Sequence, residues 1–137
     1  GMADSRALQV AGAAYQACHF LGMPECDVHL THAVVYLAMA PKSNALYKAC
    51  EACKQDVRGK RAEPVPLQLR NAPTKLMKEL DYGKGYQYAH DTEEKLTHME
   101  CMPESLKDRK YYHPTDQGEE AQTKERLEEI EEWRNQK

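Results

Sequence analysis

Three apolar segments with helical spacing, each followed or ended by a helix breaker, constrain the fold of this chain most. They cover residues 5–21, 24–40 and 43–59, with glycine or proline at the end of each. Apolar residues that recur every three or four positions form one face of an α-helix, and glycine and proline mark helix ends. Because only a few residues connect the segments, we expect three helices that pack as antiparallel neighbours.

The second and third segments supply the predicted core. The second is apolar on almost every side, which is typical of a central helix, and the third has the most regular amphipathic spacing. The residues expected in the core are Leu30, Val34, Leu37, Leu46, Cys50, Cys53 and Val57. The Cys50–Cys53 pair lacks the further ligands of a zinc site and the helix-start position of a redox pair, so we predict buried small side chains. His29 and His32 are predicted to be ordinary surface histidines, because no metal-binding motif accompanies them.

The next part of the chain is predicted to be poor in helix. Three prolines within residues 63–73 favour an extended connector. Residues 81–113 are expected to be irregular, with at most one short hairpin. Between them a short helix is expected over residues 74–80, and its inward side chains would be Leu76, Met77 and Leu80.

A longer helix is predicted at the C-terminal end. Thr115 or Asp116 would cap it, and Glu119 has capping-box spacing from Asp116. The helix would carry i,i+4 ion pairs along one side, among Glu120, Lys124 and Glu128. Its apolar stripe is narrow and consists of Leu127, Ile130 and Trp133. Such a helix is typical of a surface position or of a contact with another subunit.

Charge and tyrosine are unevenly distributed. Residues 42–84 hold ten Lys/Arg against five Asp/Glu, residues 116–137 hold four against eight, and five of the eight tyrosines lie between positions 82 and 112. Tyrosines in such a lobe pack its interior, form a subunit interface or stack on nucleic-acid bases. The candidate DNA contacts are Arg70, Lys75, Lys78 and Lys84. The candidate interface residues are Tyr82, Tyr86, Tyr88, Leu127, Ile130 and Trp133.

Several function classes find no support in the sequence. Gly83-Lys84-Gly85 lacks the frame of a phosphate loop, and no nucleophile is paired with a base, so we predict no catalytic, cofactor or metal site. No apolar run reaches the roughly 18 residues of a membrane span, and no signal peptide is visible. Five cysteines, an odd number without a secretory signal, indicate reduced thiols in a cytosolic protein.

Three blocks of sequence, taken in order, resemble one known family. Residues 33–45, 64–91 and 102–119 are similar to the C-terminal domain of the replication-associated recombination protein A family (RarA, also called MgsA), which are AAA+ ATPases that act at stalled replication forks. Asp81 and Asp108 stand where the family resemblance implies glycine, and Ser5 stands where it implies proline. The resemblance implies an all-α domain related to the clamp-loader collar, with a helix-poor, tyrosine-rich lobe and a long C-terminal helix.

The same resemblance implies a function. Residues 1–62 would form the three-helix part of the collar, and residues 63–137 the connector, short helix, lobe and C-terminal helix of the same domain. The domain would assemble a homotetramer and would not itself be an enzyme, while ATP and Mg²⁺ would bind elsewhere in a parent protein of the cytoplasm and nucleoid. DNA and replication proteins would be partners of that parent. The alternative is a free-standing helical module that binds nucleic acid; an enzyme in its own right is the weakest reading.

Overall fold

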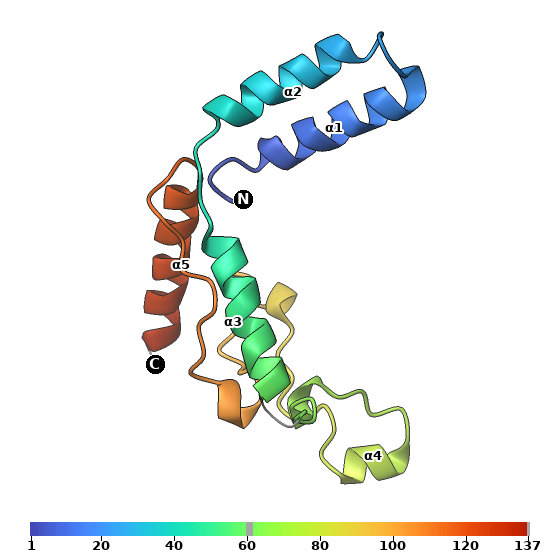
Figure 1. Ribbon diagram of the computed structural model, residues 1–137. Coiled ribbons are helices and arrows are strands. Elements are labelled where there is room, and N and C mark those ends of the chain that lie inside the picture. The colour runs from blue at the N-terminus through green and yellow to red at the C-terminus, as the bar shows by residue number, and fades with distance from the viewer. Residues whose placement is uncertain (60–61, 137) are drawn as a thin grey trace. The chain divides into compact units, whose positions relative to one another are not determined.

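The computed structural model describes residues 1–59 and 62–136 and is helical throughout its regular structure (Figure 1). Its α-helices are α1 (Arg6–Leu21), α2 (Asp27–Met39), α3 (Ala45–Gly59), α4 (Lys75–Glu79) and α5 (Glu120–Asn135). Short 3₁₀ turns cover Leu67–Leu69, Ala89–Asp91 and Glu104–Leu106. The described residues contain no strand, which confirms the all-α prediction. Residues 81–113 are irregular apart from short 3₁₀ turns, as expected, and form no hairpin.

The chain divides into two compact units. The first unit consists of Gly1–Lys54 with Tyr111–Glu131, and the second consists of Gln55–Lys110 with Glu132–Lys137. Unit 1 therefore contains α1, α2, most of α3 and most of α5. Unit 2 contains α4 and the irregular segments around it.

The helices α1 and α2 pack side by side through small residues. Ala14 of α1, Ala33 of α2 and Cys26 at the start of α2 are buried, and no bulky aliphatic or aromatic side chain of the pair is. Because alanine side chains are short, two helices that meet through them approach closely and leave their larger side chains outside. The predicted antiparallel pair is thus confirmed for the first two helices.

The predicted core is not buried. Val34 is 65% exposed and Val57 is 73% exposed, and Leu30, Leu37, Leu46, Cys50 and Cys53 are also exposed. The reason is that, among the described residues, α3 packs against neither α1 nor α2. The apolar stripe of α3 therefore has no partner among the described helices, and the prediction of buried Cys50 and Cys53 was wrong. All five cysteines are free thiols, and His29 and His32 are exposed as predicted.

In unit 2 a capped short helix leads into a tight turn. The Thr74 hydroxyl accepts a hydrogen bond from the Met77 amide at 3.3 Å and so caps α4. Leu76 and Leu80, predicted to point inward, are exposed, because this five-residue helix packs against no other helix of the described chain. The turn that follows has positive φ at Asp81, 61°, a conformation that glycine adopts most easily and that aspartate tolerates.

The start of α5 differs from the predicted one. The helix begins at Glu120 rather than directly after Thr115 or Asp116. Lys124 pairs with Asp116 at 2.7 Å instead of with a glutamate one turn away. The carboxylate expected to close the capping box, Glu119, bonds to Ser5 instead. No helix in the described ranges is long and apolar enough to cross a bilayer.

Candidate functional site

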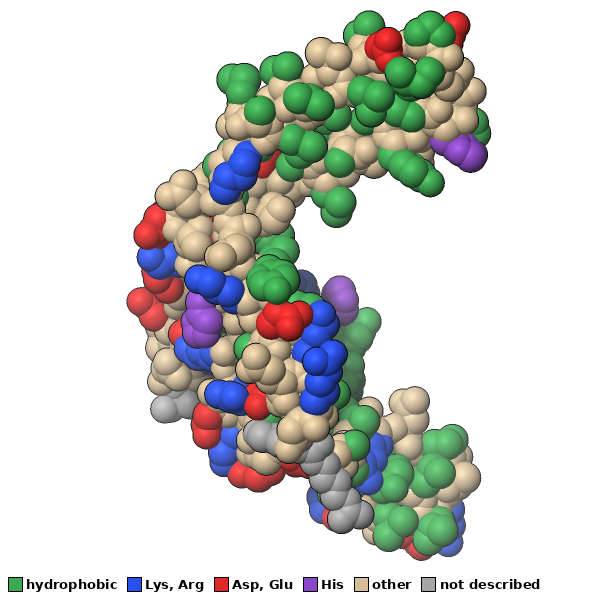
Figure 2. Space-filling view, viewed as in Figure 1, with side chains coloured by type: hydrophobic (Ala, Val, Ile, Leu, Met, Phe, Trp, Pro, Cys, Tyr) green, Lys and Arg blue, Asp and Glu red, His purple; other side chains and the backbone are tan. Residues whose placement is uncertain are grey.

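The outer surface of the α1–α2 pair exposes many of the large apolar side chains of unit 1. Leu8 is 80% exposed and Tyr15 is 74% exposed; these residues lie seven positions apart, on the same face of α1. Val28 and Val35 have the same spacing on α2 and are also exposed. Figure 2 shows hydrophobic side chains over most of the visible face of this helix pair.

Few charges interrupt this surface. From residue 6 to residue 39 the only Lys, Arg, Asp or Glu side chains are Arg6, Glu25 and Asp27. Soluble monomers seldom expose contiguous apolar patches beyond a few hundred Å², and larger patches mark interaction sites. The sequence pattern that suggested a central helix was therefore correct about the apolar character of α2, but no element among the described residues covers its outer face.

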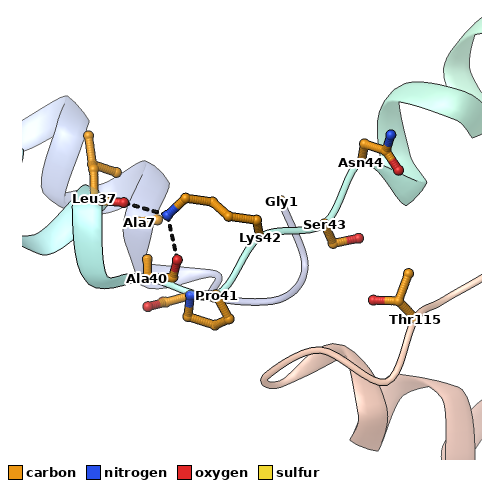
Figure 3. A pocket seen from close by; sticks show the side chains of 10 residues that line it. Gly1, Ala7, Leu37, Ala40, Pro41, Lys42, Ser43, Asn44 and Thr115 are labelled. Carbon is orange, nitrogen blue, oxygen red and sulfur yellow. Dashed lines mark hydrogen bonds between the residues drawn. The ribbon is translucent and has the colours of Figure 1, made fainter.

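Two hollows of unit 1 adjoin the C-terminal end of α2. One has a volume of about 380 Å³, and its apolar walls include Val35, Met39 and Pro41. The other has a volume of about 620 Å³ and lies between the end of α2, the linker to α3 and the segment before α5 (Figure 3). There the Lys42 ammonium donates to the Leu37 carbonyl at 2.6 Å and to the Ala40 carbonyl, which caps the end of α2.

A buried carboxylate lies beside this second hollow. Glu120 is 0% exposed, and its two oxygens accept hydrogen bonds from the Tyr112 hydroxyl at 2.7 Å and the Thr115 hydroxyl at 2.6 Å. The Ser43 hydroxyl also bonds to it. Burial alone would raise the pKa of Glu120, but the hydroxyls of Ser43, Thr115 and Tyr112 stabilise the charged form and lower its pKa to about 2. Burial, followed by the bond to Glu120, raises the pKa of Tyr112 to about 12.

The residues before α1 are hydrogen-bonded to the chain next to Glu120. The Ser5 amide and hydroxyl donate to the Glu119 carboxylate at 3.1 and 2.8 Å, and the Glu119 amide donates to the Ala3 carbonyl at 2.8 Å. The Tyr36 hydroxyl donates to Asp4 at 2.8 Å. These bonds lower the pKa of Glu119, chiefly through the Ser5 amide, and the pKa of Asp4, chiefly through Tyr36. The junction links α2, α5 and the residues before α1.

We predict that acid weakens this junction. A carboxyl group with a lowered folded-state pKa contributes stability that is complete above its ordinary pKa and is lost as the pH falls, because the unfolded chain then binds more protons. For Glu120 the loss should extend from about pH 4.5 down to about pH 2. Urea unfolding at fixed protein concentration measures the effect. Glu120→Gln should flatten the pH dependence, and an unchanged slope in that variant would contradict the assignment.

Unit 2 brings the candidate DNA contacts into one lobe. The Arg70 guanidinium lies 5.0 Å from the centre of the Tyr82 ring. Lys84 pairs with Asp81 at 3.0 Å and Lys75 reaches Glu79 at 4.0 Å, both in exposed pairs that contribute little stability. Lys78 lies on α4 and is exposed.

The candidate interface residues divide into two groups. Tyr86 and Tyr88 are exposed and Tyr82 is half-buried. On α5, Leu127, Ile130 and Trp133 are half-buried. The Trp133 ring stacks on His98 with 4.1 Å between centroids.

The sequence reasoning missed the Glu120 junction. One of its three hydroxyl partners, Ser43, is 77 positions away, and the acidic tail offers no local signal that separates Glu120 from its neighbours. Within residues 1–59 and 62–136, no three His, Cys, Asp or Glu side chains gather to hold a metal ion.

Comparison with known proteins places the chain in a family. The family described as MgsA AAA+ ATPase C terminal matches residues 1–131. The chain is 50% identical over 129 residues to replication-associated recombination protein A of Coxiella burnetii, covering 93% of this chain and 29% of that protein. It is 45% identical over 128 residues to the Escherichia coli K12 protein of the same name, and the match covers 93% of this chain and 29% of that protein. It is 44% identical over 114 residues to ATPase WRNIP1 of Dictyostelium discoideum, and this match covers 82% of this chain and 13% of that protein.

These matches lie on a part of the relatives only. The chain spans 29% of the length of the two bacterial proteins, while almost all of its own length is matched. The all-α structure agrees with the fold that the resemblance implies. The chain therefore belongs to the family of MgsA AAA+ ATPase C-terminal domains.

Proposed function

We propose that this chain is the collar that assembles its parent AAA+ ATPase, and that copies of the chain associate through the outer surface of α1 and α2. Residues 1–62 contribute the three-helix part of this collar and residues 63–137 the remainder of the same domain. In this proposal the parent acts in replication-fork maintenance and recombination; the names of the bacterial relatives refer to replication-associated recombination. Closed symmetry is the usual arrangement of identical subunits, and we propose four copies.

One observation carries the proposal: the large apolar side chains are on the outside. Among the described residues the buried apolar side chains are alanines and one cysteine, Cys26, while large apolar side chains of α1, α2 and α3 are exposed. Burial of apolar area is the dominant favourable term in folding and association. A chain that leaves this area uncovered is therefore stabilised by a partner, and α1 and α2 offer a surface with almost no charge to desolvate.

The rest of the proposal concerns the parent. The described side chains here do not fit an ATP–Mg²⁺ site, since the sequence lacks a phosphate loop. We assign ATP and Mg²⁺ to the remaining part of the parent. DNA and replication proteins are then partners of the parent, and its place is the cytoplasm, at the nucleoid. Leu127, Ile130 and Trp133 with Tyr82, Tyr86 and Tyr88 remain candidates for a second contact between subunits.

The mass of the chain in solution tests the assembly. Multi-angle light scattering should give about four times the 15.7 kDa of one chain. The double variant Leu8→Lys/Tyr15→Lys places two charges on the apolar face of α1 and should shift the mass toward the single chain, because buried unpaired charges are costly. The matched control is Gln9→Lys/Gln16→Lys, which adds the same charges with the same spacing to exposed polar positions of α1.

Three outcomes are informative. A tetramer in the wild type and control with a monomer in the first variant supports the proposal. A wild type that is monomeric at micromolar concentration contradicts it. A wild-type tetramer that survives the Leu8→Lys/Tyr15→Lys change but dissociates on Trp133→Ala would move the contact from α1 and α2 to α5.

A further inference from the structure

Two tyrosine side chains of unit 2 lie exposed on the surface and are not packed in an interior. Tyr86 is 55% exposed and Tyr88 is 53% exposed. Within the described chain neither hydroxyl takes a hydrogen bond, and the one ring contact is between Tyr88 and His90, at 5.0 Å. Tyrosines that fill a core bury the ring and satisfy the hydroxyl. The packing explanation of this tyrosine cluster therefore does not apply to these two residues.

A closed turn precedes them. The Gly83 amide donates to the Leu67 carbonyl at 2.8 Å, which joins the turn to the 3₁₀ segment before α4. Gly83 and Gly85 have φ of 76° and 82°, values that side chains seldom allow. The Arg70 guanidinium lies over the Tyr82 ring, a cation–π contact that holds the near side of the same turn. The turn that precedes the two exposed rings is therefore held in place by a backbone hydrogen bond and a cation–π contact.

The spacing between the Tyr86 and Tyr88 rings matches the spacing of bases along a single nucleic-acid strand. Tyr86 and Tyr88 are two residues apart in a segment without helix, and the backbone at Tyr88 is extended. Alternate side chains of an extended chain lie on the same side and repeat at about 6.6 Å. That repeat is roughly two base steps of about 3.4 Å. The ring of His90 beside Tyr88 lengthens the row.

Cations lie in the same lobe. Between residues 64 and 90 there are four Lys or Arg side chains and two acidic ones. Lys75, Lys78 and Lys84 are exposed, and the exposed pairs of Lys75 and Lys84 exchange readily for phosphate. Figure 2 shows hydrophobic and basic side chains together over the region of α4.

We propose that this lobe is a binding site for single-stranded nucleic acid, in which bases stack on Tyr86 and Tyr88 while Lys75, Lys78 and Lys84 neutralise phosphates. Stacking on aromatic side chains requires an accessible base face. A duplex keeps its bases stacked on one another, so the site discriminates against it. This site uses no residue of the α1 and α2 surface proposed for self-association, and it assigns Tyr86 and Tyr88 to nucleic acid in place of the second subunit contact.

Fluorescence anisotropy with a labelled oligothymidylate tests the site in the full chain. Tyr86→Ala and Tyr88→Ala should each weaken binding by about 5- to 150-fold, the equivalent of 1–3 kcal/mol per stacked base. Tyr86→Phe and Tyr88→Phe keep the ring and should bind within about twofold of the wild type. Competition by a duplex of the same length should be weaker than competition by the unlabelled single strand.

The salt dependence of the binding affinity distinguishes phosphate contacts by Lys75 and Lys78 from an effect of the overall charge of the chain. Lys75→Gln/Lys78→Gln should reduce the slope of log affinity against log salt by about 1.4, or about 0.7 per lost phosphate contact. Lys48→Gln/Lys54→Gln removes the same charge from exposed positions of α3 and should leave the slope unchanged.

Equal affinity for duplex and single strand, or full binding by the Tyr→Ala variants, would overturn the proposal. So would equally effective competition by polyglutamate, which would indicate an acidic protein partner. Light-scattering mass and circular dichroism of each variant verify that it is folded and assembled like the wild type. A failure here therefore leaves the collar proposal untouched.

Discussion

Replacing Glu120 with alanine is expected to lower the free energy of unfolding by about 3 kcal/mol or more. The change removes the acceptor of three hydroxyl groups, those of Ser43, Thr115 and Tyr112. A buried polar group left without its partner costs about 1–3 kcal/mol. Denaturant unfolding at fixed protein concentration measures the loss, since assembly makes stability depend on concentration.

Two further variants make this result specific. Tyr112→Phe removes one of the three donors and should cost about 1.5–3 kcal/mol, the range for a hydrogen bond to a charged group. Glu119→Ala removes an exposed neighbouring carboxylate bonded to Ser5 and should cost less than Glu120→Ala. Equal losses from Glu119→Ala and Glu120→Ala would show that the buried network does not stabilise the junction.

Gly118→Ala should also destabilise strongly, by about 2–5 kcal/mol. A Cβ at this position would lie 2.1 Å from the Ala3 carbonyl oxygen and 2.6 Å from Cγ of Pro41, and the residue has φ of 54°. Overpacking costs about 1–3 kcal/mol and a left-handed conformation about 1–2 kcal/mol for a residue with a Cβ. The free energy of unfolding, measured as for Glu120, should fall accordingly.

A second glycine provides the matched control. Gly59, at the end of α3, has no heavy atom within 4 Å of an added Cβ. Gly59→Ala should therefore change stability by no more than about 0.5 kcal/mol. If both alanine variants were equally stable, the close approach of the Gly118 loop to Ala3 would not exist in solution.

The helices could be predicted from the sequence because the signals are local. Periodic apolar residues and the breakers at Gly22, Pro41 and Gly59 located α1 to α3 to within a few residues. The family resemblance also implied glycine at position 81, and Asp81 indeed has positive φ.

The core was not predictable in the same way. An apolar stripe shows that a helix face will be covered, but not that the same chain covers it. Cys50 and Cys53 lie on such a stripe and are exposed. Glu120 illustrates the opposite error, since one of its three hydroxyl partners is Ser43, which is 77 positions earlier in the chain. A charged residue with such a distant partner looks in the sequence like any other helix-surface glutamate.

The alanine contact between α1 and α2 has a consequence for how the chain behaves alone. Helices that meet through alanine lie about 8 Å apart, so the pair is a thin layer whose larger apolar side chains are exposed. Such a layer offers a broad apolar surface to a neighbouring copy. Contacts of that kind close into a ring when the rotation between copies fits, and otherwise propagate as an open filament. If copies of the chain associate as proposed, a change in the angle between adjacent copies should convert a closed ring into fibres.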